Sequence, residues 1–212
     1  MFKDRADAGQ KLAKALEKYR NNPDVIVLAI PRGGVEVGLE VAKYLHSDFD
    51  MLFCRKLQYP WTTESGYGAI CEDGTIFINE QALQGVTQDD IYREIERQEA
   101  EIAHRIKVLR SGKPLKDLTN KIVILTDDGV AMGSTMIAAV KMLHKLPVKK
   151  IVVAVPTASP QAVAVLKQLA DEVVTLYTPH PFFAVADAYE RWYDVSDEEV
   201  LELLTRYSIK ND

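Results

Sequence analysis

Short apolar runs rich in β-branched residues recur along the chain, and stretches with helical spacing of apolar residues separate most of them. The strand-like runs are expected at residues 25–30, 49–54, 121–126, 150–155 and 172–177. Helices are expected at residues 4–19, 34–45, 133–145 and 159–170. Strands that alternate with helices predict an α/β fold, in which a mostly parallel sheet is flanked by helices with right-handed crossovers.

The middle of the chain follows a different pattern. Residues Tyr67–Cys71 and Thr75–Ile78 lie on either side of an Asp-Gly pair, which is typical of a tight hairpin turn. The preceding stretch, Leu57–Ser65, is polar, and we expect a loop there. A charged helix is expected from about Gln88 to Arg110, and its side that packs on the domain carries isoleucines at 91, 95, 102 and 106.

The segment from His180 to Ser208 breaks the alternation of strands and helices. It mixes aromatic residues with an acidic helix start, Ser196–Val200. We interpret this segment as a small appendage, so that residues 1–212 form a single domain without a long linker or an internal repeat. The aromatic rings could stack on a flat ligand, plug the core or contact a second copy of the chain.

Composition restricts the classes of function. The chain has 212 residues, of which 47% are hydrophobic and 27% charged, as in soluble globular proteins. A net charge of −5 gives no basic footprint for nucleic acid or for an anionic membrane. No run approaches the roughly 18 apolar residues that span a bilayer, and the N-terminus lacks the pattern of a signal peptide. We therefore expect a cytoplasmic protein that binds neither nucleic acid nor membrane.

Cysteines, histidines and common nucleotide motifs give no further site. Cys54 and Cys71 fall in or beside expected strands, and a cytoplasmic location predicts that both thiols are reduced. The four histidines are scattered, and no Cys/His spacing indicates a zinc site. The chain contains no P-loop, no G-x-G-x-x-G and no G-x-S-x-G motif. Their absence argues against a P-loop NTPase, a dinucleotide-binding protein and a hydrolase with a nucleophile elbow, respectively.

The stretch KIVILTDDGVAMGST, residues 121–135, carries most of the candidate chemistry. An apolar strand delivers Asp127 and Asp128 to its carboxyl end, where open parallel sheets bind ligands. The helix that starts near Gly133 points its free amide groups at the same place. Carboxylates suit sugar hydroxyls and amides suit a phosphate, so the stretch predicts a site for a phosphorylated sugar. An acid pair by itself is often only a cap or a solvated turn.

A second turn repeats this arrangement after the strand at 25–30. Gly33 and Gly34 let backbone amides turn toward an anion, and Arg32 adds a fixed positive charge. Arg55 and Lys56 follow the next strand, where they could neutralise a diphosphate leaving group. The alternatives are an ordinary strand–helix turn for the glycines and a plain surface for the two cations.

Taken together, these segments resemble the type I phosphoribosyltransferases. In that family the 5-phosphate loop is an apolar strand, two acids, three residues and Thr-Gly-x-Thr; the corresponding residues here are Asp127, Asp128, Gly129, Val130, Ala131, Met132, Gly133, Ser134 and Thr135. Met132 stands where the family usually has threonine, so one phosphate contact is lost or made by backbone. The N-terminal F-x-D-R-x-D-A-G (Phe2–Gly9), the PRGG turn, the Arg-Lys pair and the tail S-D-E-E-V resemble a little-characterised sub-family.

The resemblance implies a fold, a donor and a cofactor. It implies a type I phosphoribosyltransferase fold with a small hood, His180–Tyr193, over the acceptor. It also implies transfer of ribosyl 5-phosphate from phosphoribosyl pyrophosphate to a nitrogenous base, with Mg²⁺ as cofactor and pyrophosphate as product. Asp127 and Asp128 would hold the ribose hydroxyls directly or through Mg²⁺, and the pyrophosphate would be bound by Arg32, Gly33, Gly34, Arg55 and Lys56.

Resemblance further implies that Gln58–Gly66 is a lid over the site and that the chain forms a homodimer. Local packing is the alternative for the lid. A second function is also open, because the same residues would serve a non-catalytic regulator that binds phosphoribosyl pyrophosphate or a nucleotide. Met132 favours this alternative. A sugar-phosphate hydrolase ranks last, since no nucleophile or base motif supports it.

Overall fold

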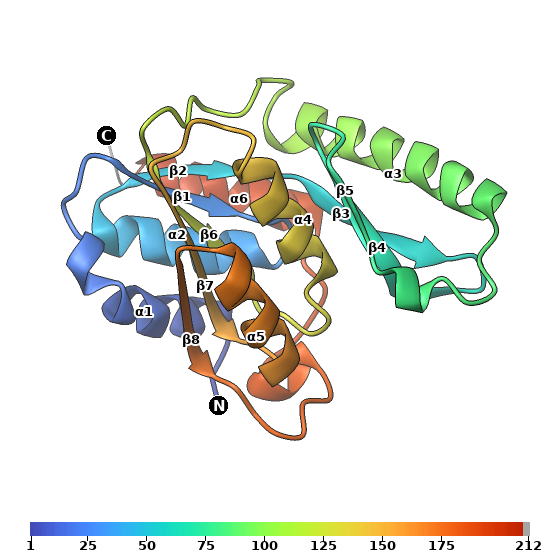
Figure 1. Ribbon diagram of the computed structural model, residues 1–212. Coiled ribbons are helices and arrows are strands. Elements are labelled where there is room, and N and C mark those ends of the chain that lie inside the picture. Colours follow the sequence, from blue (N-terminus) through green and yellow to red (C-terminus); the bar gives the residue numbers. More distant parts are fainter. Residues whose placement is uncertain (210–212) are drawn as a thin grey trace.

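The computed structural model describes residues 1–209, and the last three residues of the expected domain, 210–212, lie outside this range. A five-stranded sheet in the order β2-β1-β6-β7-β8 forms the centre of the molecule (Figure 1), and all its neighbouring strands are parallel. The strands are Val25–Ala29 (β1), Asp48–Met51 (β2), Ile122–Thr126 (β6), Lys150–Thr157 (β7) and Glu172–Tyr177 (β8). The parallel sheet confirms the fold class expected from the alternating pattern.

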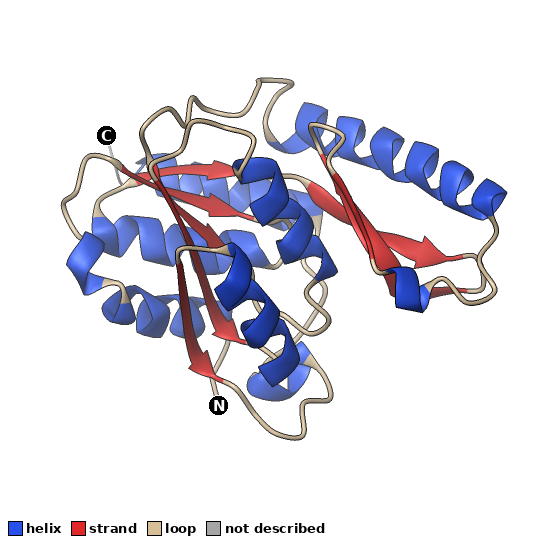
Figure 2. Cartoon of the chain, in the orientation of Figure 1, coloured by secondary structure: helices blue, strands red, loops and turns tan. Residues whose placement is uncertain are grey.

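Helices cover both faces of this sheet (Figure 2). On one face α1 (Arg5–Ala15) and α2 (Gly34–Leu45) bury apolar side chains, and on the other face α4 (Ser134–Leu143) and α5 (Pro160–Leu169) do so. Every residue of β1 and β6 is buried, which explains their uninterrupted apolar sequences. The first helix is shorter than expected, because a 3-10 turn, η1 (Glu17–Tyr19), replaces its last part.

A second, antiparallel sheet stands beside the first (Figure 1). It consists of β3 (Cys54–Tyr59), β4 (Thr62–Cys71) and β5 (Ile76–Ile78), and the short helix η2 (Glu80–Ala82) leads from it to the long helix α3 (Gln88–Leu109). The expected hairpin around the Asp-Gly turn is confirmed. The prediction of a loop at Leu57–Ser65 is wrong: β3 and β4 run through it, and only Pro60 and Trp61 separate them. The strand expected at 49–54 is likewise divided between β2 and β3.

The state of the cysteines also corrects the sequence-based expectation. Cys54 and Cys71 lie opposite each other in β3 and β4 and form a disulfide, so the thiols are not reduced in this structure. The pattern of apolar residues placed both cysteines near strands but did not give the register of the hairpin. That register brings the two side chains onto the same face, beside the core under α4.

The C-terminal segment closes over the amino end of the chain. It contains the 3-10 turn η3 (Val185–Ala188) and the helix α6 (Asp197–Ile209), which packs against α2 and α3. Phe2 joins the segment through backbone hydrogen bonds to Ala188 and Glu190, and its ring lies 5.6 Å from that of Tyr189. Within residues 1–209 no helix combines the length and the apolar character needed to cross a bilayer.

Candidate active site

The loop after β6 forms one wall of the candidate site. It is fastened to the neighbouring strand, because the Val130 amide donates to the Thr157 carbonyl at 2.9 Å and the Ser159 amide donates to the Val130 carbonyl at 2.9 Å. Gly133 has φ 88°, a left-handed conformation that favours glycine, and it turns the chain into α4. The free amide groups at the start of α4 therefore face the loop.

A cavity of about 300 Å³ lies over this loop. The loop contributes most of the wall, β3 and β4 close the opposite side, and Val185 of the hood adds an apolar contact. The lining residues are Lys56, Glu64, Ser65, Gly66, Asp127, Gly129, Val130, Ala131, Met132, Gly133, Ser134, Thr135, Met136 and Val185. Lys56 thus joins the expected phosphate loop although the two are far apart in the sequence. Met132 is 72% exposed, so its side chain does not pack in the core.

The PRGG turn packs directly on the acid pair. A Cβ atom at Gly33 would come within 1.9 Å of Asp128 Oδ2, and one at Gly34 within 2.9 Å of the Asp127 Cα. Both glycines are therefore required for the close approach of the two loops. The peptide bond between Pro31 and Arg32 is cis, and Arg32 Nη1 lies 3.4 Å from Asp197 Oδ1. The sequence-predicted turn and acids thus form one site.

Arg5 is a residue of this site that the sequence did not reveal. Its Nε atom pairs with Asp128 Oδ2 at 2.9 Å, and its Nη1 donates to the Tyr193 carbonyl at 3.0 Å. The guanidinium also lies 4.1 Å from the centre of the Trp192 ring. Arg5 is part of the N-terminal motif that marked the resemblance, but its contact with Asp128 spans 123 residues of sequence. The motif therefore singled out the residue without indicating its partner.

The two carboxyl groups are crowded and poorly solvated. Burial raises the pKa of Asp127 well above its usual range, and the negative charge of Asp128 adds to the effect. Burial also raises the pKa of Asp128, while the positive charge of Arg5 opposes the rise. The Tyr189 hydroxyl donates to the Asp128 carbonyl at 2.5 Å and holds the hood against the pair. A cation or a hydroxyl donor that reaches the pair would stabilise the charged form of the carboxylates.

The acid pair fits a magnesium ion that is held partly by substrate. Among the residues that the structure describes, no group of three or more His, Cys, Asp or Glu side chains could hold a metal by itself. Mg²⁺ usually binds through one or two carboxylates together with substrate oxygens and water. Asp127 and Asp128 are two adjacent carboxylates, and Arg5 pairs with an oxygen of the second. They are a suitable set of hard oxygen ligands for that purpose.

Arg55 and Lys56 lie on opposite faces of β3. The Lys56 Nζ atom faces the cavity and donates to the Glu64 carbonyl at 2.5 Å. Burial and the charge of Arg55 lower the pKa of Lys56. Arg55 faces α3 instead, where its Nε donates to Gln98 Oε1 at 3.0 Å. The two cations therefore have different surroundings.

Comparisons with known proteins agree with this fold. The family model described as "Phosphoribosyl transferase domain" matches residues 3–190. The chain therefore belongs to the phosphoribosyl transferase domain family, a family of transferases. It is 39% identical over 208 residues to a Mycobacterium tuberculosis protein named "Putative phosphoribosyl transferase". That alignment covers 97% of this chain and 47% of the relative, so the chain spans about half the length of the curated relatives it matches.

Solved structures show the same fold. The TT1426 protein of Thermus thermophilus is 38% identical, with a TM-score of 0.78, and the match covers 97% of this chain and 98% of that one. The AQ2163 protein of Aquifex aeolicus is 15% identical, with a TM-score of 0.50 and coverage of 81% and 73%. The second likeness concerns the fold alone.

Proposed function

We propose that the protein transfers the ribosyl 5-phosphate group of phosphoribosyl pyrophosphate to a nitrogenous base or related acceptor and releases pyrophosphate. The supporting observation is that one cavity is lined jointly by Asp127, the amide-rich start of α4 and Lys56. A carboxylate for sugar hydroxyls, amides for a monophosphate and a cation for a diphosphate are the three features that this donor requires.

The 5-phosphate would be bound by the loop after β6. Amides of Ala131–Thr135 and the hydroxyls of Ser134 and Thr135 are its proposed ligands, at the positive end of the α4 dipole. Because Met132 is exposed, its lack of a hydroxyl removes one possible contact and leaves the backbone ligands in place. Asp127 and Asp128 would hold the ribose hydroxyls, directly or through Mg²⁺.

The diphosphate would lie toward the PRGG turn and β3. Gly33 and Gly34 bring their backbone beside the acids, and Arg32, Arg55 and Lys56 are the proposed cations. Bound Mg²⁺ would supply positive charge that neutralises the diphosphate and its developing negative charge. As the C1–O bond breaks, the carboxylates face growing positive charge on the ribose, so catalysis rests on positioning and electrostatics.

The acceptor is proposed to bind under the hood. Val185 already forms part of the cavity wall, and Phe183, Trp192 and Tyr193 keep exposed ring surface that could stack on a base. A cytoplasmic location and a homodimer are part of the same proposal.

Asp128→Asn tests the assignment of the acid pair. The substitution keeps the shape of the side chain and removes the charge, so we expect pyrophosphate release to fall by at least about 100-fold. The protein is first titrated calorimetrically with phosphoribosyl pyrophosphate, with and without Mg²⁺, and bases are then screened for pyrophosphate release. Asp89→Asn at the exposed start of α3 is the matched control. Unchanged turnover in a folded Asp128→Asn protein would contradict the assignment.

The non-catalytic regulator is the alternative function. Two observations favour it: Met132 replaces a hydroxyl in the phosphate loop, and Arg5 already occupies one oxygen of Asp128. Under this alternative, phosphoribosyl pyrophosphate or a nucleotide binds with Mg²⁺ and no base in the screen releases pyrophosphate.

A further inference from the structure

The long helix α3 turns a polar surface toward β3. Gln98 is 1% exposed, Arg105 5% and Glu94 9%, and their spacing places all three on one face of the helix. The expected apolar contacts of Ile91 and Ile102 are present on this helix as well. Burying polar groups costs free energy unless they find partners, so the partners of this polar surface indicate its role.

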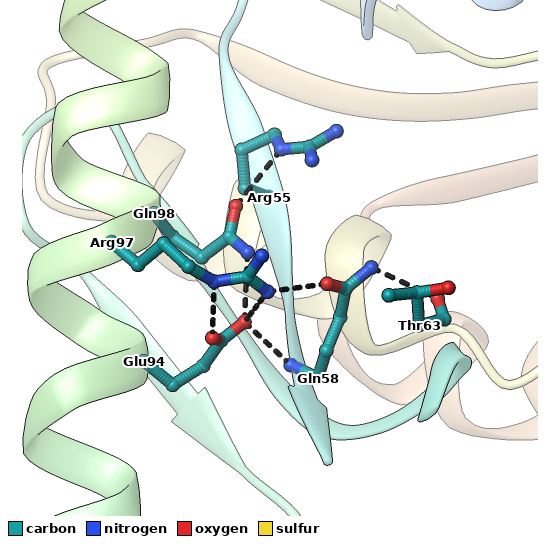
Figure 3. Close-up of polar contacts among 6 residues, drawn as sticks. All are labelled: Arg55, Gln58, Thr63, Glu94, Arg97 and Gln98. Carbon is teal, nitrogen blue, oxygen red and sulfur yellow. Dashed lines mark hydrogen bonds and ion pairs between the residues drawn. The ribbon is translucent and has the colours of Figure 1, made fainter. Parts of the chain in front are cut away.

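Glu94 and Gln98 connect α3 to the β3–β4 hairpin (Figure 3). Glu94 Oε1 accepts from the Gln58 amide at 2.9 Å and from Gln98 Nε2 at 2.7 Å. Arg97 pairs with Glu94 and donates to Gln58 Oε1. The Gln58 side chain in turn donates to the Thr63 carbonyl at 2.9 Å, on the other strand of the hairpin. The helix therefore fixes the hairpin that carries Arg55 and Lys56.

Arg55 lies at the end of this network, and only its Nε atom takes part in it. Gln98 Oε1 accepts from its Nε, and Figure 3 shows its terminal nitrogens pointing away from the network. Within residues 1–209 these two nitrogens donate to no protein acceptor. An oriented guanidinium with both terminal amino groups free has the geometry for a bidentate bond to phosphate oxygens.

The charges around Arg55 also favour an anion. Burial lowers the pKa of Arg55 to about 10, and the positive charges of Arg105 and Arg32 add to the effect. Arg105 pairs with Glu101 at 2.8 Å, and Arg32 pairs with Asp197 at 3.4 Å. Arg97 likewise lowers the pKa of Arg55, and Glu101 opposes the effect.

We propose that α3 is part of the diphosphate site, with Gln98 as a positioning residue that orients Arg55 toward the anion bound by Arg32 and the PRGG turn. The proposal rests on the proposed function and deepens it. It gives a role at the diphosphate site to a helix residue, Gln98, that lies 43 residues after Arg55 in the sequence. Gln98 touches no substrate and acts through Arg55.

Gln98→Met is the direct test. It keeps the volume of the side chain and removes the acceptor of Arg55 Nε. Inorganic pyrophosphate is titrated into protein that is already saturated with ribose 5-phosphate, so that the 5-phosphate loop is filled. We expect pyrophosphate binding to weaken by about tenfold, while the affinity for ribose 5-phosphate alone stays within about twofold of wild type. Glu99→Met, on the exposed side of the same helix, is the matched control and should change neither value.

A double-mutant cycle separates positioning from general damage. If Gln98 acts through Arg55, Gln98→Met has no further effect on pyrophosphate binding in an Arg55→Ala background. An additive effect in that background, or equal losses for both ligands, would overturn the proposal. If Gln98→Met does not fold, Gln98→Asn gives the same test, because it keeps the amide and withdraws its oxygen from Arg55. Wild-type protein that binds neither ligand would contradict the proposed function itself, whereas wild-type binding that survives Gln98→Met contradicts only the role of α3.

Discussion

At the scale of single residues, Gly33 is the most constrained position in the site. A Cβ atom there would lie 1.9 Å from Asp128 Oδ2 and 3.1 Å from Arg5 Nε, inside the ion pair. We therefore expect Gly33→Ala to displace the Asp128 carboxylate from Arg5. Overpacking of this kind costs about 1–3 kcal/mol, and denaturant unfolding measures the loss.

The same prediction has an internal control. In an Asp128→Ala background the carboxylate is absent, so adding the methyl group of Gly33→Ala should cost much less stability than it does in wild type. Equal costs in the two backgrounds would show that the methyl group meets some other obstacle. Gly33 has φ −58°, a backbone conformation that alanine adopts without strain. The substitution therefore tests only the space around the new methyl group.

Local sequence patterns indicated those candidate residues that lie near the carboxyl ends of their own strands. The structure brings Asp127, the loop after β6 and Lys56 to one cavity, and it places Gly33 against Asp128. Arg5 was not predicted as a site residue, because nothing in its neighbourhood indicates a partner 123 residues away. Arg55 and Lys56 were read as one unit, whereas strand geometry turns successive side chains to opposite faces.

At the scale of elements, the parallel sheet was predictable and the small sheet only in part. Runs such as Val25–Ala29 are buried throughout and read clearly as strands. The start of β4 carries the exposed polar residues Thr63, Glu64 and Ser65, which is why the sequence there resembles a loop. On α3 the isoleucines predicted a buried side, yet Glu94 and Gln98 are buried too. Their burial depends on Gln58 and Arg55 of β3, and that tertiary contact has no local signal.

The edge of the parallel sheet gives a prediction about pH and stability. Glu172 of β8 accepts from Tyr19 at 2.5 Å and from Lys150 at 2.9 Å, and it pairs with Lys18 at 2.7 Å. Burial alone would raise the pKa of Glu172, but these bonds lower it to about 2. Its stabilising contribution is therefore complete above the pKa of the unfolded chain, roughly 4.5, and is lost as the pH falls toward 2.

Glu172→Gln should remove that contribution. We expect the variant to lose about 1 kcal/mol of unfolding free energy at pH 7, a value reduced for solvent screening, and to differ less from wild type as the pH falls toward 2. Unfolding curves in urea at several pH values measure the difference. Glu202→Gln, at an exposed pair with Arg206, is the control and should be nearly neutral at every pH. A constant difference between Glu172→Gln and wild type across the acid range would contradict the pKa-based account.

At the scale of the whole molecule, the candidate site joins parts of the chain that lie far apart in the sequence. The parallel sheet supplies Asp127 and the loop after β6, the small sheet supplies Lys56, and the hood supplies Val185. The N-terminal helix adds Arg5, whose guanidinium lies between Asp128 and Trp192. A ligand in the cavity would therefore contact both sheets and the hood at once, and it would stabilise their arrangement relative to the unfolded chain.

This arrangement predicts a large thermal shift with the proposed donor. A ligand at about 100 times its dissociation constant adds about 2.7 kcal/mol, which for a chain of this length raises the melting temperature by about 5–11 °C. Phosphoribosyl pyrophosphate with Mg²⁺ should give such a shift. Ribose 5-phosphate at the same concentration should give a smaller one, because it leaves the Lys56 side of the cavity unfilled and binds more weakly. Scanning calorimetry with each ligand and with Mg²⁺ alone measures the difference. Equal shifts for the two sugars would mean that the diphosphate contributes no binding, and the small sheet would then have no part in the site.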